Sequence, residues 1–168
     1  MPLMGTSVPQ TIIIRHAGEG EQRWFAGGGT FTMKAASEET NGTLALFEDD
    51  LVRGKVTPLH QHPTFEETIY VLDGELLVHV DNEQHRVGAR GVVVFPRGVA
   101  HAFMCISETA RILAIQTPAL FSFYLDASDA VTSPEQANRP PDFDRLRAAA
   151  QRSDDIELLG PPPFARPS

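Results

Sequence analysis

Three histidines and one glutamate stand at spacings that can bring four metal ligands together. His60 and His62 are separated by one residue, so on an extended segment both imidazoles project to the same side. Glu67 follows five positions after His62, and Pro63 interrupts the segment so that a bend can return the carboxylate to that side. His101 follows much later, at the start of another apolar run. Together these residues predict a metal site.

The kind of metal follows from the donor atoms. Three neutral imidazoles and one carboxylate suit Fe, Mn, Ni, Co, Cu or Zn, whereas calcium prefers mainly oxygen donors. We therefore expect one divalent first-row transition metal. In an octahedral field four protein ligands leave two positions open for a substrate, or for a substrate and dioxygen, which points to an enzyme.

Glu66 precedes Glu67 directly, so the residues must be told apart by position. On a strand Glu67 shares a face with Ile69 and Val71, and Glu66 lies on the other face. We therefore expect Glu67 to be the ligand. Its carboxylate is also a candidate catalytic base for a substrate hydroxyl.

Short apolar, β-branched runs separated by Gly, Pro, Asn and Asp must position these residues. Turn signals at Asp73-Gly74 and at 81–83 predict hairpins, so the core is expected to be a meander of antiparallel strands in a sandwich or barrel. The predicted strands cover residues 43–47, 67–72, 75–80, 84–87, 92–95, 102–106, 110–116 and 121–125.

The flanks differ in character from this core. Residues 12–14 and 24–35 are expected to add edge strands, the latter interrupted by a loop at 27–29. Helix signals follow at 133–136 and 143–152, and a proline-rich tail closes the chain. We expect one structural domain with N-terminal strands and loops in 1–42, a barrel in 43–125 and a helical segment with tail in 126–168.

Composition restricts the partners and the location. The 168 residues carry 22 acidic and 14 basic side chains, a formal charge of −8 that disfavours nucleic acid. No run approaches the roughly 18 to 20 apolar residues that cross a bilayer. With Cys105 as the single cysteine, no internal disulfide can form. These features predict a soluble, cytoplasmic protein without membrane or nucleic-acid partners.

The spacing in the first motif also resembles that of a known family. Gly54, His60, His62, Glu67 and Gly74 stand at the intervals of the first cupin motif. The match is complete, and it is too specific to be a chance pattern. The chain is therefore similar to the cupins over about residues 43–125.

The second cupin motif is similar but not identical. The turn at 96–98 and His101 fit it, but Arg90 stands where the pattern has glycine, which is displaced here to Gly91. Cys105 stands where the pattern has asparagine. We interpret the first departure as a turn variant, whereas the second falls inside the expected barrel.

The resemblance implies an all-β fold, a small antiparallel jelly-roll barrel, here followed by short C-terminal helices. It places the metal in the mouth of the barrel, on the same four residues that the spacing selects: His60, His62, Glu67 and His101. Cupin barrels commonly pair through edge strands, which implies a homodimer; the strands around Ile12 and Thr30 are the candidates.

Among cupins the chain looks like small bacterial quercetin 2,3-dioxygenase-like proteins, also in the segment 117–124. This likeness implies an oxygenase for a small aromatic or enolic substrate such as a flavonol. Glu67 would take the proton of a substrate hydroxyl before dioxygen adds to the ring. Three alternatives stay open: a metal-dependent isomerase, cyclase or decarboxylase, a barrel that only binds a small molecule, and a structural protein.

Further side chains are candidates for the substrate pocket. Phe103 and Cys105 share the parity of His101 on a strand and should face the interior. For each candidate, ordinary core packing is the competing explanation, and for Cys105 so is a small buried filler. The full set is Phe47, Tyr70, Phe103, Cys105, Phe121 and Phe123.

Overall fold

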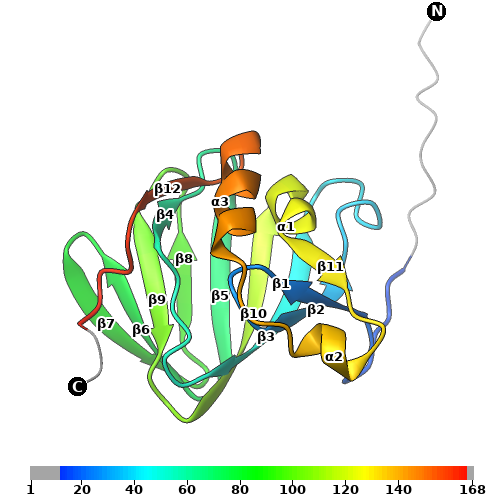
Figure 1. Ribbon diagram of the computed structural model, residues 1–168, viewed down its shortest axis with the longest axis horizontal. Coiled ribbons are helices and arrows are strands. Elements are labelled where there is room, and N and C mark those ends of the chain that lie inside the picture. Colours follow the sequence, from blue (N-terminus) through cyan, green and yellow to red (C-terminus); the bar gives the residue numbers. More distant parts are fainter. Residues whose placement is uncertain (1–11, 166–168) are drawn as a thin grey trace, which may run out of the picture.

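The protein folds into two antiparallel sheets that face each other (Figure 1). A computed structural model describes residues 12–165. The first sheet has seven strands, in the spatial order β11 (Ser128–Ala130), β1 (Glu21–Phe25), β2 (Thr30–Ala35), β3 (Ala45–Val52), β10 (Thr109–Thr117), β5 (Glu66–Asp73) and β8 (Val92–Phe95). The second has five, in the order β12 (Glu157–Gly160), β4 (Leu59–Gln61), β9 (His101–Cys105), β6 (Glu75–Val80) and β7 (Glu83–Gly88).

The space between the sheets is filled by alternating side chains. In β5, Glu67, Ile69 and Val71 are buried, while Glu66 and Tyr70 are exposed. This period of two is what a strand with one face on a core requires. Part of this space is filled by an apolar cluster that includes Leu51, Leu76, Val78, Ile112 and Cys105. The all-β jelly-roll prediction is confirmed.

Most predicted strands are present, but the strand predicted at 121–125 is not, because residues 122–126 are helical. The short helix α1 (Ser122–Asp126) replaces the predicted strand. Its first turn brings Phe121 onto Tyr124, with ring centroids 5.0 Å apart, and leaves Phe123 buried on the other side. The aromatic spacing fits a helical turn as well as a strand, and packing decided between them.

The Asp73-Gly74 turn is not a hairpin, contrary to the prediction. β5 and β6 belong to different sheets, so this turn carries the chain across the barrel. Gly74 has φ +80°, and a Cβ there would lie 2.3 Å from the carbonyl oxygen of Thr109. The predicted hairpin at Asp81 and Asn82 is confirmed, since β6 pairs with β7 and both residues have positive φ.

The N-terminal edge strands are also placed differently. Residues 12–14 form no strand, and 24–35 falls into β1 and β2 on either side of the glycine loop. Both strands are paired on two sides, because β11 adds to the sheet outside β1. Within residues 12–165 the sheet edges are therefore β11, β8, β12 and β7. Thr30 on β2 is not on an edge.

The C-terminal segment covers one open side between the sheets. Both predicted helices are present: α2 (Pro134–Ala137) is capped by Ser133, and α3 (Phe143–Arg152) by Asp142, whose side chain accepts from the Arg145 amide. After α3 the chain adds β12 to β4, a strand that the sequence did not predict. α3 contacts both α1 and β12 (Figure 1). No helix of residues 12–165 is long and apolar enough to span a membrane.

Candidate metal centre

Both sheets contribute to one buried group of histidines and a glutamate. His60 lies on β4 and His62 directly follows it, while His101 opens β9 and pairs with His60 across the two strands. Glu67 enters from β5 in the opposite sheet. All four side chains are buried, and one donor atom from each lies within 4.8 Å of the others. The structure thus brings together all four residues that the sequence selected.

The glutamate carboxylate bridges the two sheets. Its Oε2 atom lies 3.3 Å from Nε2 of His101 and 3.5 Å from Nε2 of His62. The rings of His60 and His101 have centroids 4.4 Å apart. Two of the histidine rings stack on phenylalanine rings. The ring centroids of Phe95 and His101 are 3.8 Å apart, and those of Phe65 and His62 are 4.3 Å apart.

Backbone carbonyls determine which nitrogen of each histidine faces the centre. Nδ1 of His60 lies 2.8 Å from the Pro58 oxygen, Nδ1 of His62 lies 3.1 Å from the Asp155 oxygen, and Nδ1 of His101 lies 2.9 Å from the Val99 oxygen. A carbonyl oxygen only accepts, so each Nδ1 carries the proton and donates. Each Nε2 therefore presents a lone pair, the arrangement found in metal-bound histidines.

This donor set fits a metal ion. Three Nε2 lone pairs and a carboxylate are all acceptors, and acceptors at these distances repel unless a cation lies among them. Nε2 of His62 is buried and has no hydrogen-bond partner among residues 12–165. Nitrogen and oxygen donors in this proportion suit a first-row transition metal better than calcium or magnesium. The residues present therefore match a divalent transition metal.

Electrostatics keep the donors in their ligating forms. Burial, and then the neighbouring His101 and His62, lower the pKa of His60 to about 3, so its ring is neutral near pH 7. Burial on its own raises the pKa of Glu67, but His62 and His101 outweigh it and hold that pKa below its usual range. Glu67 is consequently a carboxylate.

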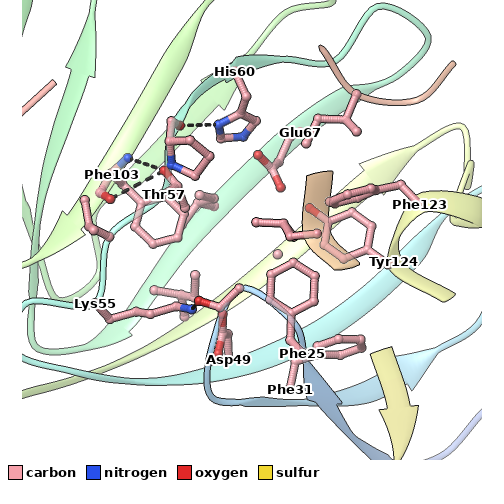
Figure 2. Close-up of a pocket in the computed structure, with 18 of the residues that line it drawn as sticks. Phe25, Phe31, Asp49, Lys55, Thr57, His60, Glu67, Phe103, Phe123 and Tyr124 are labelled. Carbon is pink, nitrogen blue, oxygen red and sulfur yellow. Dashed lines mark hydrogen bonds between the residues drawn. The ribbon is translucent and has the colours of Figure 1, made fainter. Parts of the chain in front are cut away.

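An aromatic cavity opens from this centre. The centre of a water molecule can occupy about 80 Å³ of it, and His60 and Glu67 form part of its wall (Figure 2). α3 and β12 cover it with Phe143, Leu146 and Leu158. The aromatic side chains of the barrel that line it are Phe25, Phe31, Phe47, Phe103, Phe123 and Tyr124.

Three of the predicted pocket residues line this cavity: Phe47, Phe103 and Phe123. The others do not. Tyr70 is 36% exposed on the outer face of β5, where its parity opposite Glu67 places it. Phe121 packs behind the wall, against Phe47 and Tyr124. Cys105 is buried in the interior as predicted, but it packs in the apolar cluster and does not line the cavity.

Some lining residues had no place in the sequence prediction. Asp49 and Lys55 line the cavity, and so do Tyr124 and the C-terminal residues Ile156 and Leu158. The period of two could have identified Asp49, because it lies on the same face of β3 as the buried positions 45, 47 and 51. The C-terminal residues carry no comparable signal, since their role depends on where the chain returns to the barrel.

Two facing antiparallel sheets with a buried group of three histidines and a glutamate define a class of protein, and sequence comparison agrees. The family model described as a cupin domain matches residues 48–116. An RmlC-like cupin from Shewanella frigidimarina NCIMB 400 superposes with a TM-score of 0.58 at 22% identity, over 68% of this chain and 97% of its own. Residues 48–116 therefore match a cupin domain, and the comparisons support a protein of the cupin superfamily.

A curated relative is named for an activity. Quercetin 2,3-dioxygenase of Bacillus subtilis (strain 168) is 28% identical over 149 residues, which cover 84% of this chain and 43% of the relative. The chain thus spans less than half the length of that relative. The match supports membership of the superfamily, and the relative's own activity is that of a longer protein.

Proposed function

We propose that this cupin is a metal-dependent oxygenase for a small aromatic or enolic molecule such as a flavonol. The observation that carries the proposal is that the four-donor centre opens directly into an aromatic cavity, with His60 and Glu67 in its wall. A planar substrate can therefore approach the metal ligands while its rings lie against apolar side chains.

Each part of the site has a role in this proposal. A bound transition metal supplies Lewis acidity toward substrate oxygen atoms and the redox chemistry that reaction with dioxygen requires. Glu67 offers a carboxylate that can accept the proton of a substrate hydroxyl. Phe31, Phe103 and Tyr124 exclude water and orient the ring. The carbonyls behind the three histidines hold the donors in position.

The relative named quercetin 2,3-dioxygenase supports the substrate class, although it is more than twice as long as the matched region. Oxygen consumption separates this proposal from the other enzymatic candidates. An isomerase, cyclase or decarboxylase would use the same ligands and keep its turnover under argon. A barrel that only binds small molecules would turn nothing over in either atmosphere.

The test combines metal analysis with oxygen uptake. Protein purified without chelators is analysed for transition metals, then supplied with a panel of flavonols and catechol-like compounds in an oxygen electrode. We expect metal near one equivalent and steady uptake, both lost in His101→Ala. Glu66→Gln is the matched control, because that neighbour of Glu67 is exposed on the other face of β5. No uptake across the panel in fully loaded protein would sink the proposal.

A further inference from the structure

A carboxyl group lies inside the cavity, away from the metal centre. Asp49 is on β3, where it shares one face of the strand with the buried Phe47 and Leu51 and so faces the interior. Its cross-strand neighbours are Phe31 on β2 and Ile112 on β10, both buried and apolar. In Figure 2, Asp49 and Lys55 lie at one end of the cavity, and His60 and Glu67 lie at the other.

Nothing in the described residues 12–165 hydrogen-bonds to the Asp49 side chain, which forms no ion pair there either. Burial raises the pKa of this carboxyl to about 7, and Lys55 only partly offsets the effect. The side chain is half-buried in the wall of the cavity, where a carboxyl gains from a hydrogen-bond partner that water or a ligand can supply. Asp49 is therefore available to a molecule that enters the cavity.

Lys55 is held beside this end of the cavity by the loop between β1 and β2. Its Nζ donates to the carbonyl oxygens of Gly27 and Gly28. Its own backbone is fixed at both ends, by a 3.0 Å bond from its amide to the Val52 oxygen and a 2.9 Å bond from the Cys105 amide to its oxygen. An ammonium group has three N–H donors, so one remains after the two carbonyls.

We propose that Asp49 and Lys55 form a polar subsite that binds a hydroxyl group at the end of the substrate opposite the metal centre. This inference rests on the proposed function and narrows its substrate class. The substrate carries oxygen donors at one end, an apolar ring system in the middle and a hydroxyl at the far end. The hydroxyl is bound by Asp49 as acceptor and Lys55 as donor.

The pairing of charges selects a hydroxyl over other polar groups. A ligand ammonium would meet Lys55, and a ligand carboxylate would meet Asp49, so each would lose by repulsion part of what it gains by attraction. A hydroxyl both donates and accepts, and it carries no charge that must be desolvated. It is the group that uses both side chains.

The test measures equilibrium binding in metal-loaded protein under argon by isothermal titration calorimetry. The probes are 3-hydroxyflavone and its derivatives with one further hydroxyl at the 4′ or the 7 position, which place that group at either far end of the molecule. We expect one derivative to bind wild type roughly tenfold more tightly than 3-hydroxyflavone, the value of a hydrogen bond to a charged group. Asp49→Leu should remove this preference and leave 3-hydroxyflavone binding within about twofold.

Two further variants separate recognition from packing. Asp49→Asn keeps a carbonyl acceptor and should retain part of the preference. Glu48→Gln changes the neighbouring acid, whose position on β3 faces outward. This variant should leave the preference for the hydroxylated flavone unchanged. Equal binding of all three flavones by wild type, or a preference that survives Asp49→Leu, overturns the subsite, as does no binding of any flavone.

The outcomes distinguish this inference from the proposed function, because the binding measurement is made without oxygen and does not depend on turnover. A preference that depends on Asp49, without oxygen uptake by the loaded protein, supports the subsite and removes the oxygenase. Oxygen uptake on flavonols without such a preference supports the oxygenase and removes the subsite.

Discussion

Replacing Glu67 by glutamine should remove most of the stabilisation that the protein gains from a transition metal. Glu67 is the one carboxylate among the four donors, and the other three are histidines. Its Oε2 atom lies 3.3 Å from Nε2 of His101 and 3.5 Å from Nε2 of His62. The amide of glutamine has nearly the same shape but no charge. The substitution therefore tests the donor and leaves the packing of β5 in place.

The size of the effect follows from linkage. A metal that binds only the folded state adds about 2.7 kcal/mol at a free concentration of about 100 times its Kd. For a chain of this length each kcal/mol raises Tm by about 2–4 °C, so wild type should gain about 5–11 °C. Loss of a ligand should weaken binding at least as much as loss of an outer partner, roughly 100-fold. At the same metal concentration the variant then gains about 0.4 kcal/mol, near 1 °C.

Differential scanning fluorimetry on metal-depleted protein, titrated in turn with Mn²⁺, Ni²⁺, Co²⁺ and Zn²⁺, measures both shifts. Glu66→Gln is the control and should match wild type, because Glu66 is exposed on the opposite face of the same strand. The reasoning fails if Glu67→Gln shows the wild-type shift, or if Glu66→Gln loses it.

Three further changes test other parts of the structure. Asp155→Ala removes the carboxylate that accepts from the Ser122 hydroxyl at 2.5 Å, and it should lower the free energy of unfolding by about 1–3 kcal/mol in urea denaturation; an unchanged midpoint would contradict this role. Gly74→Ala should cost at least about 1–2 kcal/mol, because φ is +80° and the new Cβ would meet the Thr109 oxygen, and a thermal melt within error of wild type would refute the steric argument. Asp49 has a pKa that burial raises from 3.8 to about 7, so its contribution to stability is complete below pH 4 and is lost as pH rises through 7. The Tm of wild type relative to Asp49→Asn should accordingly fall between pH 4 and 7 in a series of thermal melts, and a pH-independent difference would show that the carboxyl is not desolvated.

The candidate site was largely predictable because its signals are local. The single residue between His60 and His62 places both rings on one side of an extended segment, and the period of two separates Glu67 from Glu66. The same period placed Phe103 and Cys105 in the interior. These relations follow from strand geometry over a few residues, so they hold before any tertiary contact is known.

The errors arose where the outcome depended on distant segments. Asp73-Gly74 has the composition of a hairpin turn, yet it joins two sheets, because Thr109 and Ala110 pack against Gly74. The aromatic spacing at 121–125 suits either a strand or a helix, and stacking of Phe121 on Tyr124 accompanies the helix. Turn and propensity signals are weaker than such contacts.

The sequence by itself therefore predicted the all-β fold and the four side chains that the structure brings together, since both depend on residue type and short-range periodicity. The tertiary structure alone decided that Glu67 reaches the histidines from the opposite sheet, that Asp155 orients His62 through its carbonyl, and that α3 and β12 cover an aromatic cavity. These relations join residues far apart in the chain, and only the packing of the two sheets brings them together.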